Sequence, residues 1–322
     1  MDEFISGLAT PIASLIRLKH DLGFDYTCSA RHLQVFDAWC ADVFPGQTTL
    51  TKDMAMTWAQ LRDGEHPNGL MRRITPIRQL GKHMAGLGLD AYLIPARLPG
   101  GRTHYTPHVF TRDEITALLT AIDACPRPPR GGWRDLVMPM LFRLLYCLGL
   151  RPCEASRLTV NDVDLVSGRV FIRESKGHHD RVVFMNPDLA SYSRIYDAAI
   201  ATWCPTRQTF LPNPWGKPYS TSTFDVWFHE FWDQLTLARQ ARAASPPRLY
   251  DLRHTHVVHL IGSWVQSGKD INQLMPYLNT HLGHVHYADT WYYFHLVPEH
   301  FDWLASLTAD TPGPCLPEAS HV

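Results

Sequence analysis

Four segments of the sequence place chargeable side chains inside or directly beside apolar stretches. They are Leu148–Ala155, the charged run 174–180, Tyr250–His256 and Leu282–His295. An unpaired charge among apolar groups is costly, so each segment needs a partner or a function. A guanidinium is permanently charged and can donate to two oxygens of one phosphate. A tyrosine hydroxyl becomes a nucleophile in a positive, hydrogen-bonding pocket. These are the residue types that chemistry at a phosphodiester requires.

Each segment, taken singly, also has an ordinary structural explanation. Arg151 can pair with Glu154 or with a helix end, and a lysine such as Lys176 at a hairpin tip is common. The chemical interpretation therefore depends on the four segments taken together. It also depends on the elements that must bring them to one place.

The elements expected to carry these segments lie in the second part of the chain. Thr111 and Glu114 have the spacing of a capping box at a helix start, and residues 133–150 are apolar enough for a buried helix. Residues 169–173 and 181–185 alternate like two strands. This pattern predicts a β-hairpin with Lys176 in its charged tip. A helical pattern follows from about 224 to 307, and 308–322 is typical of a loose tail.

The first part of the chain, from Ile12 to about Ala96, has helical spacing throughout. Its last stretch, 70–87, predicts a helix entered at Thr75-Pro76. That stretch carries a local stripe of positive charge, whose ordinary explanation is a solvated face. The stripe consists of Arg72, Arg73, Arg78, Lys82 and His83. Residues 94–102 have the Pro/Gly content of a linker.

Composition limits the class of protein. The chain has 322 residues, 45% of them hydrophobic and 19% charged, which predicts two globular domains rather than disorder. No apolar run is long enough for a membrane span, and no secretory signal is apparent. Seven scattered cysteines favour a reducing compartment over a disulfide framework. A net charge of −1 gives no global sign of a polyanion partner, so any nucleic-acid contact must come from local clusters.

In this order, the four segments resemble the tyrosine recombinase (phage integrase) superfamily. The matched features are a Gly-Leu-Arg-x-x-Glu turn at 149–154, a hairpin lysine, an Arg-His-Thr helix start, a Leu-Gly-His, and a tyrosine nine residues after that histidine. The resemblance covers residues 108–305 closely. It implies a mainly α fold with a small β-sheet (α+β). It also implies a helical core-binding domain at 1–96, a linker at 97–107, a catalytic domain at 108–307 and a tail at 308–322.

The resemblance assigns roles to single residues. Arg151 and Arg253 match the two arginines that hold the scissile phosphate, and Lys176 matches the general acid. His284 matches the histidine of the third motif, and Tyr293 matches the nucleophile. Because the bond energy is kept in a phosphotyrosine ester, resealing needs no nucleotide cofactor, and the two arginines can replace a metal ion.

The same resemblance implies the partners. It predicts double-stranded DNA held in a C-shaped clamp, with Arg72, Arg73, Arg78 and Lys82 on its inner face. It further predicts a tetramer on DNA, in which the segment Pro298–Leu304 docks on a neighbouring protomer. Accessory recombination proteins, a bacterial nucleoid-associated location in the cytoplasm, and no membrane contact are also expected.

Two positions leave the assignment open. The family most often has histidine three residues before the second arginine, and this chain has Tyr250, which cannot titrate near neutrality. His254 and His256 are near enough in sequence to be substitutes. Tyr292 precedes Tyr293, and adjacent helical residues point about 100° apart. We therefore expect only one tyrosine to face the pocket, and the spacing from His284 favours Tyr293.

Three rival interpretations compete with a recombinase. Six histidines could form the zinc site of a hydrolase, although two histidines separated by one residue on a helix point apart. They are His254, His256, His259, His281, His284 and His286. A catalytically silent DNA-binding protein would keep the fold without the reaction. A type IB topoisomerase would share the chemistry but act as a monomer.

Overall fold

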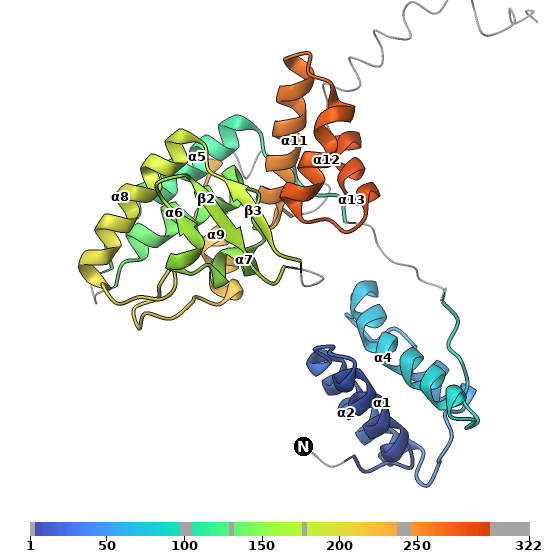
Figure 1. Cartoon of the computed structure of the whole chain (residues 1–322). Helices are drawn as coiled ribbons and strands as arrows, with labels where there is room; N and C mark the ends of the chain where they lie inside the picture. The colour runs from blue at the N-terminus through green and yellow to red at the C-terminus, as the bar shows by residue number, and fades with distance from the viewer. Residues whose placement is uncertain (1–3, 97–104, 129–131, 176–178, 237–245, 297–322) are drawn as a thin grey trace, which may run out of the picture. The chain divides into compact units, whose positions relative to one another are not determined.

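The computed structural model describes residues 4–96, 105–128, 132–175, 179–236 and 246–296 (Figure 1). The chain divides into two compact units, Met1–Tyr105 and Thr106–Val322. The division falls within 97–107, the linker that the resemblance implies, and three residues beyond the Pro/Gly-rich stretch 94–102. Over the described ranges, none of the helices is both long and apolar enough to cross a membrane.

The first unit is helical within its described residues. Its helices are α1 (Ala9–Asp21), α2 (Thr27–Val43), α3 (Lys52–Trp58) and α4 (Pro67–Gly86). Both α1 and α2 pack on α4. The core is mainly aliphatic and includes an aromatic cluster, where the buried ring of Phe36 lies 5.1 Å from Trp58 and 5.8 Å from Trp39 between centroids.

Helix α4 starts earlier than the sequence pattern predicts. It begins at Pro67, whose missing N–H is not needed at the first helical position, and His66 caps it by accepting from the Asn68 amide. Pro76 lies inside the helix with its ring buried. An entry at Thr75-Pro76 was therefore wrong, because an internal proline costs one backbone hydrogen bond that burial of the surrounding face offsets.

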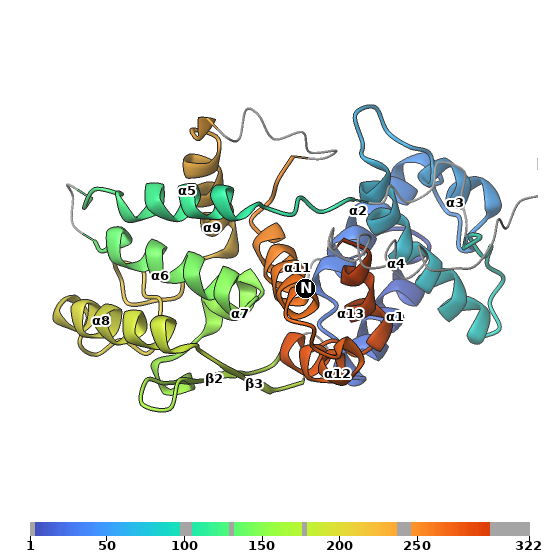
Figure 2. The same cartoon turned by 90° about the horizontal axis from the view of Figure 1, so that it is seen from above.

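The second unit is built around the buried helix that the apolar run 133–150 predicts. The helices and strands that surround the core are α5 (Arg112–Asp123), α6 (Arg134–Cys147), α7 (Pro152–Arg157), η1 (Val160–Asp162), β1 (Val163–Asp164), β2 (Arg169–Ile172), β3 (Arg181–Phe184), α8 (Pro187–Trp203) and α9 (Thr221–Trp232). Helix α6 lies between α5 and α8 (Figure 2). The predicted capping box at the start of α5 is confirmed, since Thr111 and Glu114 exchange hydrogen bonds.

The predicted hairpin is confirmed as part of a three-stranded antiparallel sheet in the order β1-β2-β3. Strand β2 pairs with β3 from Arg169 opposite Phe184 to Ile172 opposite Arg181. Burial alternates along both strands, and in β3 the inward positions are Arg181 and Val183. Strand β3 therefore begins with a charged residue, Arg181, at an inward-pointing position.

A second helical layer completes this unit. It consists of α11 (Asp251–Gln266), α12 (Ile271–Leu282), α13 (Tyr287–Trp291) and η2 (Tyr292–Leu296). These elements share a core that includes Ile261, Met275, Leu278 and Tyr293. Helix α11 also packs on α6, and α12 packs on β3. The fold is mainly helical with a small sheet, as the sequence predicts.

Candidate active site

A tight turn sets the position of Arg151. Gly149 links α6 to α7 with a positive φ of 61°, and a Cβ atom there would lie 2.6 Å from Cδ2 of His256. A larger residue would therefore strain the backbone and clash with α11. Arg151 follows as the N-cap of α7, and Pro152 occupies the first turn.

The Glu154 carboxylate joins three arginines. Arg151 and Arg181 each donate to it at 2.7–2.8 Å, and Arg253 Nη1 lies 4.0 Å away. Ser175 Oγ donates to the same carboxylate at 2.8 Å. Burial opposes the charged form of Glu154, but these cations outweigh burial and hold its pKa well below the usual range. Glu154 is therefore a buried anion that orients the guanidinium groups.

Arg253 is 1% exposed and fixed by backbone carbonyls from two other elements. It donates to Gly149 O at 2.6 Å and to Leu282 O at 2.7 Å. Burial, followed by the charge of Arg151, lowers the pKa of Arg253. Two guanidinium groups so close together favour an anion between them.

The end of α12 positions His284. Gly283 takes the left-handed conformation that terminates the helix, with φ 62°. His284 Nδ1 lies 2.8 Å from Thr290 Oγ1, and its Nε2 lies 3.4 Å from Arg253 Nη2. Burial, followed by the charges of Arg253 and Arg151, lowers the pKa of His284 to about 4.

Tyr293 lies beside these groups and is 4% exposed. Its ring stacks parallel to His284 at 6.1 Å between centroids. Burial raises the pKa of Tyr293 to about 12, while Arg253 acts in the opposite direction. Tyr292 is 46% exposed. Both tyrosines line the cavity, so the expectation that only one would face it was wrong, but Tyr293 is the one held against His284 and Arg253.

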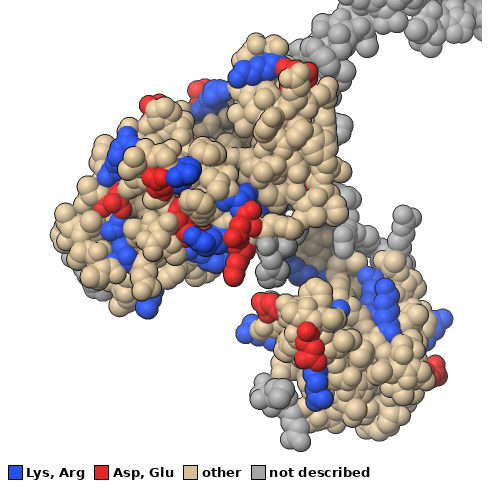
Figure 3. Space-filling view, viewed as in Figure 1, with Lys and Arg blue, Asp and Glu red and all other residues tan. Residues whose placement is uncertain are grey.

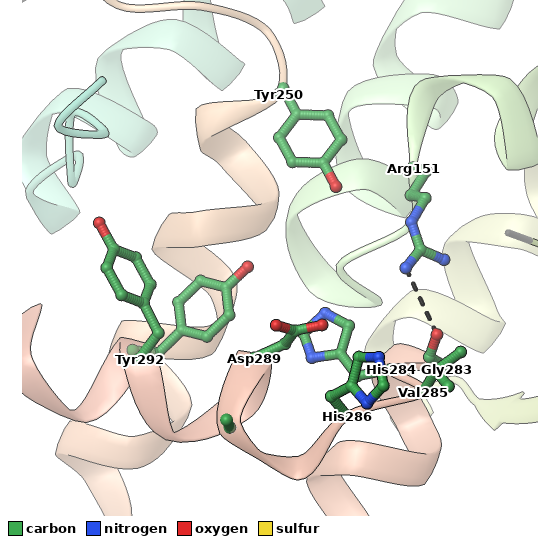
Figure 4. A pocket seen from close by; sticks show the side chains of 10 residues that line it. Arg151, Tyr250, Gly283, His284, Val285, His286, Asp289 and Tyr292 are labelled. Carbon is green, nitrogen blue, oxygen red and sulfur yellow. Dashed lines mark hydrogen bonds between the residues drawn. The ribbon is translucent and has the colours of Figure 1, made fainter. Parts of the chain in front are cut away.

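Tyr250 occupies the rim of the site. Its hydroxyl points towards Arg151 (Figure 4). Burial opposes the charge of Arg151, but Glu154 and a hydrogen bond with Tyr250 outweigh burial and raise the pKa of Arg151. His254 lies between the aromatic rings, 5.2 Å from Tyr250 and 5.3 Å from Tyr293. His256 instead stacks on His281 away from the cavity.

One open cavity of about 650 Å³ lies among these groups, and Glu154, Arg253 and His254 are not part of its lining. Its lining consists of Arg151, Tyr250, Gly283, His284, Val285, His286, Ala288, Asp289, Tyr292 and Tyr293. Basic and acidic side chains are interspersed on the visible face of the second unit (Figure 3). The cavity lining itself contains one arginine, Arg151, and one carboxylate, Asp289.

Some predicted residues do not join this cavity. Lys176 and the segment Pro298–Leu304 lie outside the described residues. Arg73 is 6% exposed and pairs with Glu65 inside the first unit, so it is not part of an exposed stripe. Arg72 and Lys82 are exposed, and Arg78 is half-buried. Among the described residues no group of three or more side chains suits a metal ion, which leaves the zinc interpretation without support.

The family is decided by comparison with known proteins. Residues 108–300 match the sequence model of the phage integrase family. The chain belongs to this family. The resemblance to tyrosine recombinases is thereby confirmed, over the segments that hold Arg151, Arg253, His284 and Tyr293.

Individual known proteins are similar to this chain over most of its length. A Sinorhizobium fredii protein named as an integrase/recombinase, y4rE, is 28% identical over 91% of this chain and 93% of its own length. The tyrosine recombinase XerA of Thermococcus kodakarensis is 27% identical over 75% of this chain and 76% of its own. The solved structure of the XerH recombinase bound to difH in a post-cleavage complex has a TM-score of 0.64, 16% identity, and covers 88% of this chain and 79% of that one. This last likeness shows a shared fold.

Sequence reasoning missed two residues that organise this integrase site. Arg181 holds the Glu154 carboxylate and donates to His281 O at 2.7 Å. The sequence signal for Arg181 was a charged residue at a position of β3 that the strand alternation predicts to point inward. Asn279 accepts a hydrogen bond from the side chain of Thr290 and fixes it. The only sequence signal for Asn279 was its position close to Gly283, at the end of α12.

Proposed function

We propose that this chain is a site-specific DNA recombinase that cleaves and rejoins strands through a 3′-phosphotyrosyl intermediate on Tyr293. The observation that carries the proposal is the placement of Tyr293 beside Arg253 and His284 in a cavity that Arg151 also lines. The names of the relatives, integrase/recombinase and tyrosine recombinase, agree with it.

The arginines supply the charge that the reaction needs. When Tyr293 Oη attacks phosphorus, negative charge accumulates on the two non-bridging oxygens. Arg151 and Arg253 are permanently cationic and are already oriented by Glu154 and by the carbonyls of Gly149 and Leu282. In the proposed reaction Arg151, which lines the cavity, and the buried Arg253 stabilise the pentacoordinate state through their positive charge.

The leaving group also needs a proton. The bond from phosphorus to the 5′ oxygen breaks, and we assign Lys176 as the donor to that oxygen. Ser175, the residue before it, accepts a hydrogen bond of 2.8 Å from Arg151, so the chain reaches the arginine site where it enters the hairpin tip. Attack of a 5′ hydroxyl on the phosphotyrosine reverses the step and reseals a strand.

We further propose that recombination takes place in a tetramer on double-stranded DNA, during integration, excision or transposition of a mobile element. A mainly apolar cavity of about 470 Å³ at one end of α11 and α12 supports the docking of the C-terminal segment on a neighbour. Its lining includes Val265, Ile271, Trp291 and Phe294. XerH was solved on its own DNA site, which supports the choice of partner.

Covalent capture tests the proposed function. A pool of nicked duplexes with a randomised centre is incubated with the protein in chelator, and adducts that resist denaturant are isolated and sequenced. Wild type and Tyr292→Phe should form adducts, and Tyr293→Phe should not, because the ester requires its hydroxyl. An adduct that persists in Tyr293→Phe and vanishes in Tyr292→Phe would reassign the nucleophile. A silent DNA-binding protein would form none, and a type IB topoisomerase would relax supercoils without joining two sites.

A further inference from the structure

A chain of hydrogen bonds behind the cavity fixes the orientation of the Asn279 amide. The backbone carbonyl of His284 lies 3.1 Å from the Asn279 side-chain nitrogen, and a carbonyl can only accept. The amide nitrogen must therefore face that carbonyl. The opposite end of the amide, Oδ1, then faces Thr290 Oγ1 at 2.7 Å. That oxygen is also a pure acceptor.

The next link decides the tautomer of His284. Thr290 is fully buried, and its one hydroxyl proton goes to Asn279. The hydroxyl oxygen can then only accept from His284 Nδ1, which lies 2.8 Å away. Neutral His284 therefore carries its proton on Nδ1. Its other nitrogen, Nε2, holds a lone pair, and Arg253 Nη2 lies 3.4 Å from it as a donor.

We propose that His284 Nε2 takes the proton of Tyr293 during strand cleavage, and that Asn279 and Thr290 are positioning residues that keep this nitrogen basic. The inference rests on the proposed function. In the step, the Tyr293 O–H proton passes to Nε2 while the phenolic oxygen bonds to phosphorus. The bond to the 5′ oxygen breaks, and that oxygen is protonated by Lys176. His284 becomes an imidazolium, still donating through Nδ1 to Thr290.

The site needs such an acceptor because Tyr250 stands where the family most often has histidine. A phenol cannot accept a proton near neutrality. The ring of His284 lies parallel to that of Tyr293 at 6.1 Å between centroids, and both residues lie beside Arg253. His254 also approaches Tyr293, at 5.3 Å between ring centroids. Its Nδ1 has no hydrogen-bond partner in the described residues, so nothing there sets its tautomer.

The charges around His284 explain why proton transfer would accompany attack. Arg253 and Arg151 oppose an imidazolium, as Arg181 does, whereas Asp289 favours it. In the free protein burial, which is the largest cause of the lowered pKa of His284, and the cations together keep the ring neutral. The negative charge that builds on phosphorus during attack adds to the favourable side. The proton is therefore accepted when the transition state forms and not before.

The kinetic test uses a duplex whose cleavage position has been mapped with wild type and whose scissile 5′ oxygen is replaced by sulfur. A thiolate leaves without protonation, so this duplex isolates activation of the nucleophile. Wild-type cleavage should be nearly independent of pH between 6 and 9. Cleavage by His284→Gln should be slow and rise by about tenfold per pH unit, because hydroxide must replace the lost base. Lys176→Ala should regain the wild-type rate on this duplex.

The control variant is His254→Gln, which should keep the flat profile. The inference is overturned if His284→Gln also stays flat, if the sulfur restores it to the wild-type rate, or if His254→Gln shows the rising profile. Wild type forms adducts in each of these cases, so the proposed function stands. Absence of adducts in wild type itself would refute the proposed function instead.

Thr290 supplies a matched pair that tests the positioning role. Thr290→Ser keeps the hydroxyl, and Thr290→Val keeps the shape but removes it. Nitrogen NMR of histidine-labelled protein should show Nδ1 protonated and Nε2 free in wild type and Thr290→Ser. In Thr290→Val this preference should be lost, and cleavage should fall by about tenfold or more with unchanged duplex binding. A wild-type ring protonated on Nε2 would refute the assigned tautomer.

Discussion

At the scale of single residues, the site depends on one buried anion. Glu154 and Arg181 have side chains only 3% and 4% exposed, and they pair through two hydrogen bonds of 2.8 Å. Arg151 and Ser175 share the same carboxylate. Buried charges tolerate each other only while all partners are present. Glu154 thus holds the guanidinium groups in place, and in the proposed function it orients them for a phosphate.

We predict that Glu154→Gln lowers the free energy of unfolding by about 3–5 kcal/mol, because it leaves buried guanidinium groups without their counter-charge. Urea denaturation measures the change. The matched control is Asp123→Asn, which breaks the ion pair with Arg143 through a carboxylate that is 43% exposed. That variant should lose no more than about 1 kcal/mol. Equal losses in the two variants would show that burial of Glu154 is unimportant.

At the scale of elements, helices α11 and α12 and the turn that follows α12 carry histidines that burial keeps neutral. Burial is the largest cause of the lowered pKa of each of these histidines. It lowers the pKa of His254 and His284 to about 4, that of His256 to about 3, and that of His281 in the same direction. An unfolded histidine binds its proton near a pH of about 6.5. Between these values the unfolded chain holds more protons than the folded one.

We predict that the second unit loses stability as pH falls from about 6.5 towards 4, since protons then favour the unfolded state. A histidine with a folded pKa of about 4 contributes about 2 kcal/mol to this loss at pH 5. Urea denaturation at pH 7.5 and pH 5 measures it. His256→Gln should reduce the difference between the two pH values, while His229→Gln, an exposed position on α9, should leave it unchanged. An unchanged difference in His256→Gln would contradict the assignment.

Helix α4 separates its basic residues between two faces. Arg73 donates to Glu65 and to the carbonyl of Gln60, at 2.8 Å in both cases. Arg72 and Lys82 face solvent. Arg78 donates to the carbonyl of Ala96 at 3.2 Å. The stripe that we retain as a DNA-binding surface therefore consists of Arg72, Arg78 and Lys82.

We predict that alanine at Arg72, Arg78 and Lys82 flattens the salt dependence of duplex binding, by about 0.9 in the log–log slope for each phosphate that the variant no longer neutralises. Titration of a labelled duplex at several salt concentrations measures the slope. Alanine at Arg17 and Arg31, two exposed arginines of the same unit, is the control and should change the slope less. An unaltered slope in the triple variant would return the stripe to the role of a solvated face.

At the scale of the whole molecule, the surface that we propose for assembly lies at the end of the described chain. The cavity formed by Val265, Ile271, Trp291 and Phe294 presents an apolar surface there. The segment Pro298–Leu304 that follows is itself rich in apolar side chains. In the proposed tetramer this segment occupies the corresponding cavity of a neighbour.

We predict that a chain ending at Leu296 remains as stable a monomer as wild type but no longer forms the same higher-order complexes on paired target sites. Thermal unfolding and gel mobility on DNA measure the two properties. A destabilised monomer would show instead that the segment folds back on its own chain. Equal stability together with unchanged complexes would contradict both versions.

The sequence by itself determined the residue types, their order and most of the helices. The spacing from Arg151 to Glu154 and from His284 to Tyr293 is local, and so are the capping box at Thr111 and the alternating strands. Local patterns are set by backbone geometry over a few residues, so they can be recognised without the fold. The burial of Arg73 could also have been inferred from the sequence, although the predicted stripe included it, because Arg73 shares a helical face with Ile77 and Leu80.

Only the tertiary structure decided which polar groups meet. Arg181 lies 27 residues from Glu154 along the chain, and Arg253 lies 104 residues from Gly149, yet the members of each pair are hydrogen-bonded. The tautomer of His284 depends on Asn279 and Thr290, which α12 and α13 bring together. Such pairings arise from the packing of whole elements, and no local pattern contains that information. The chemistry of the site could therefore be named from the sequence, but the direction of each proton could not.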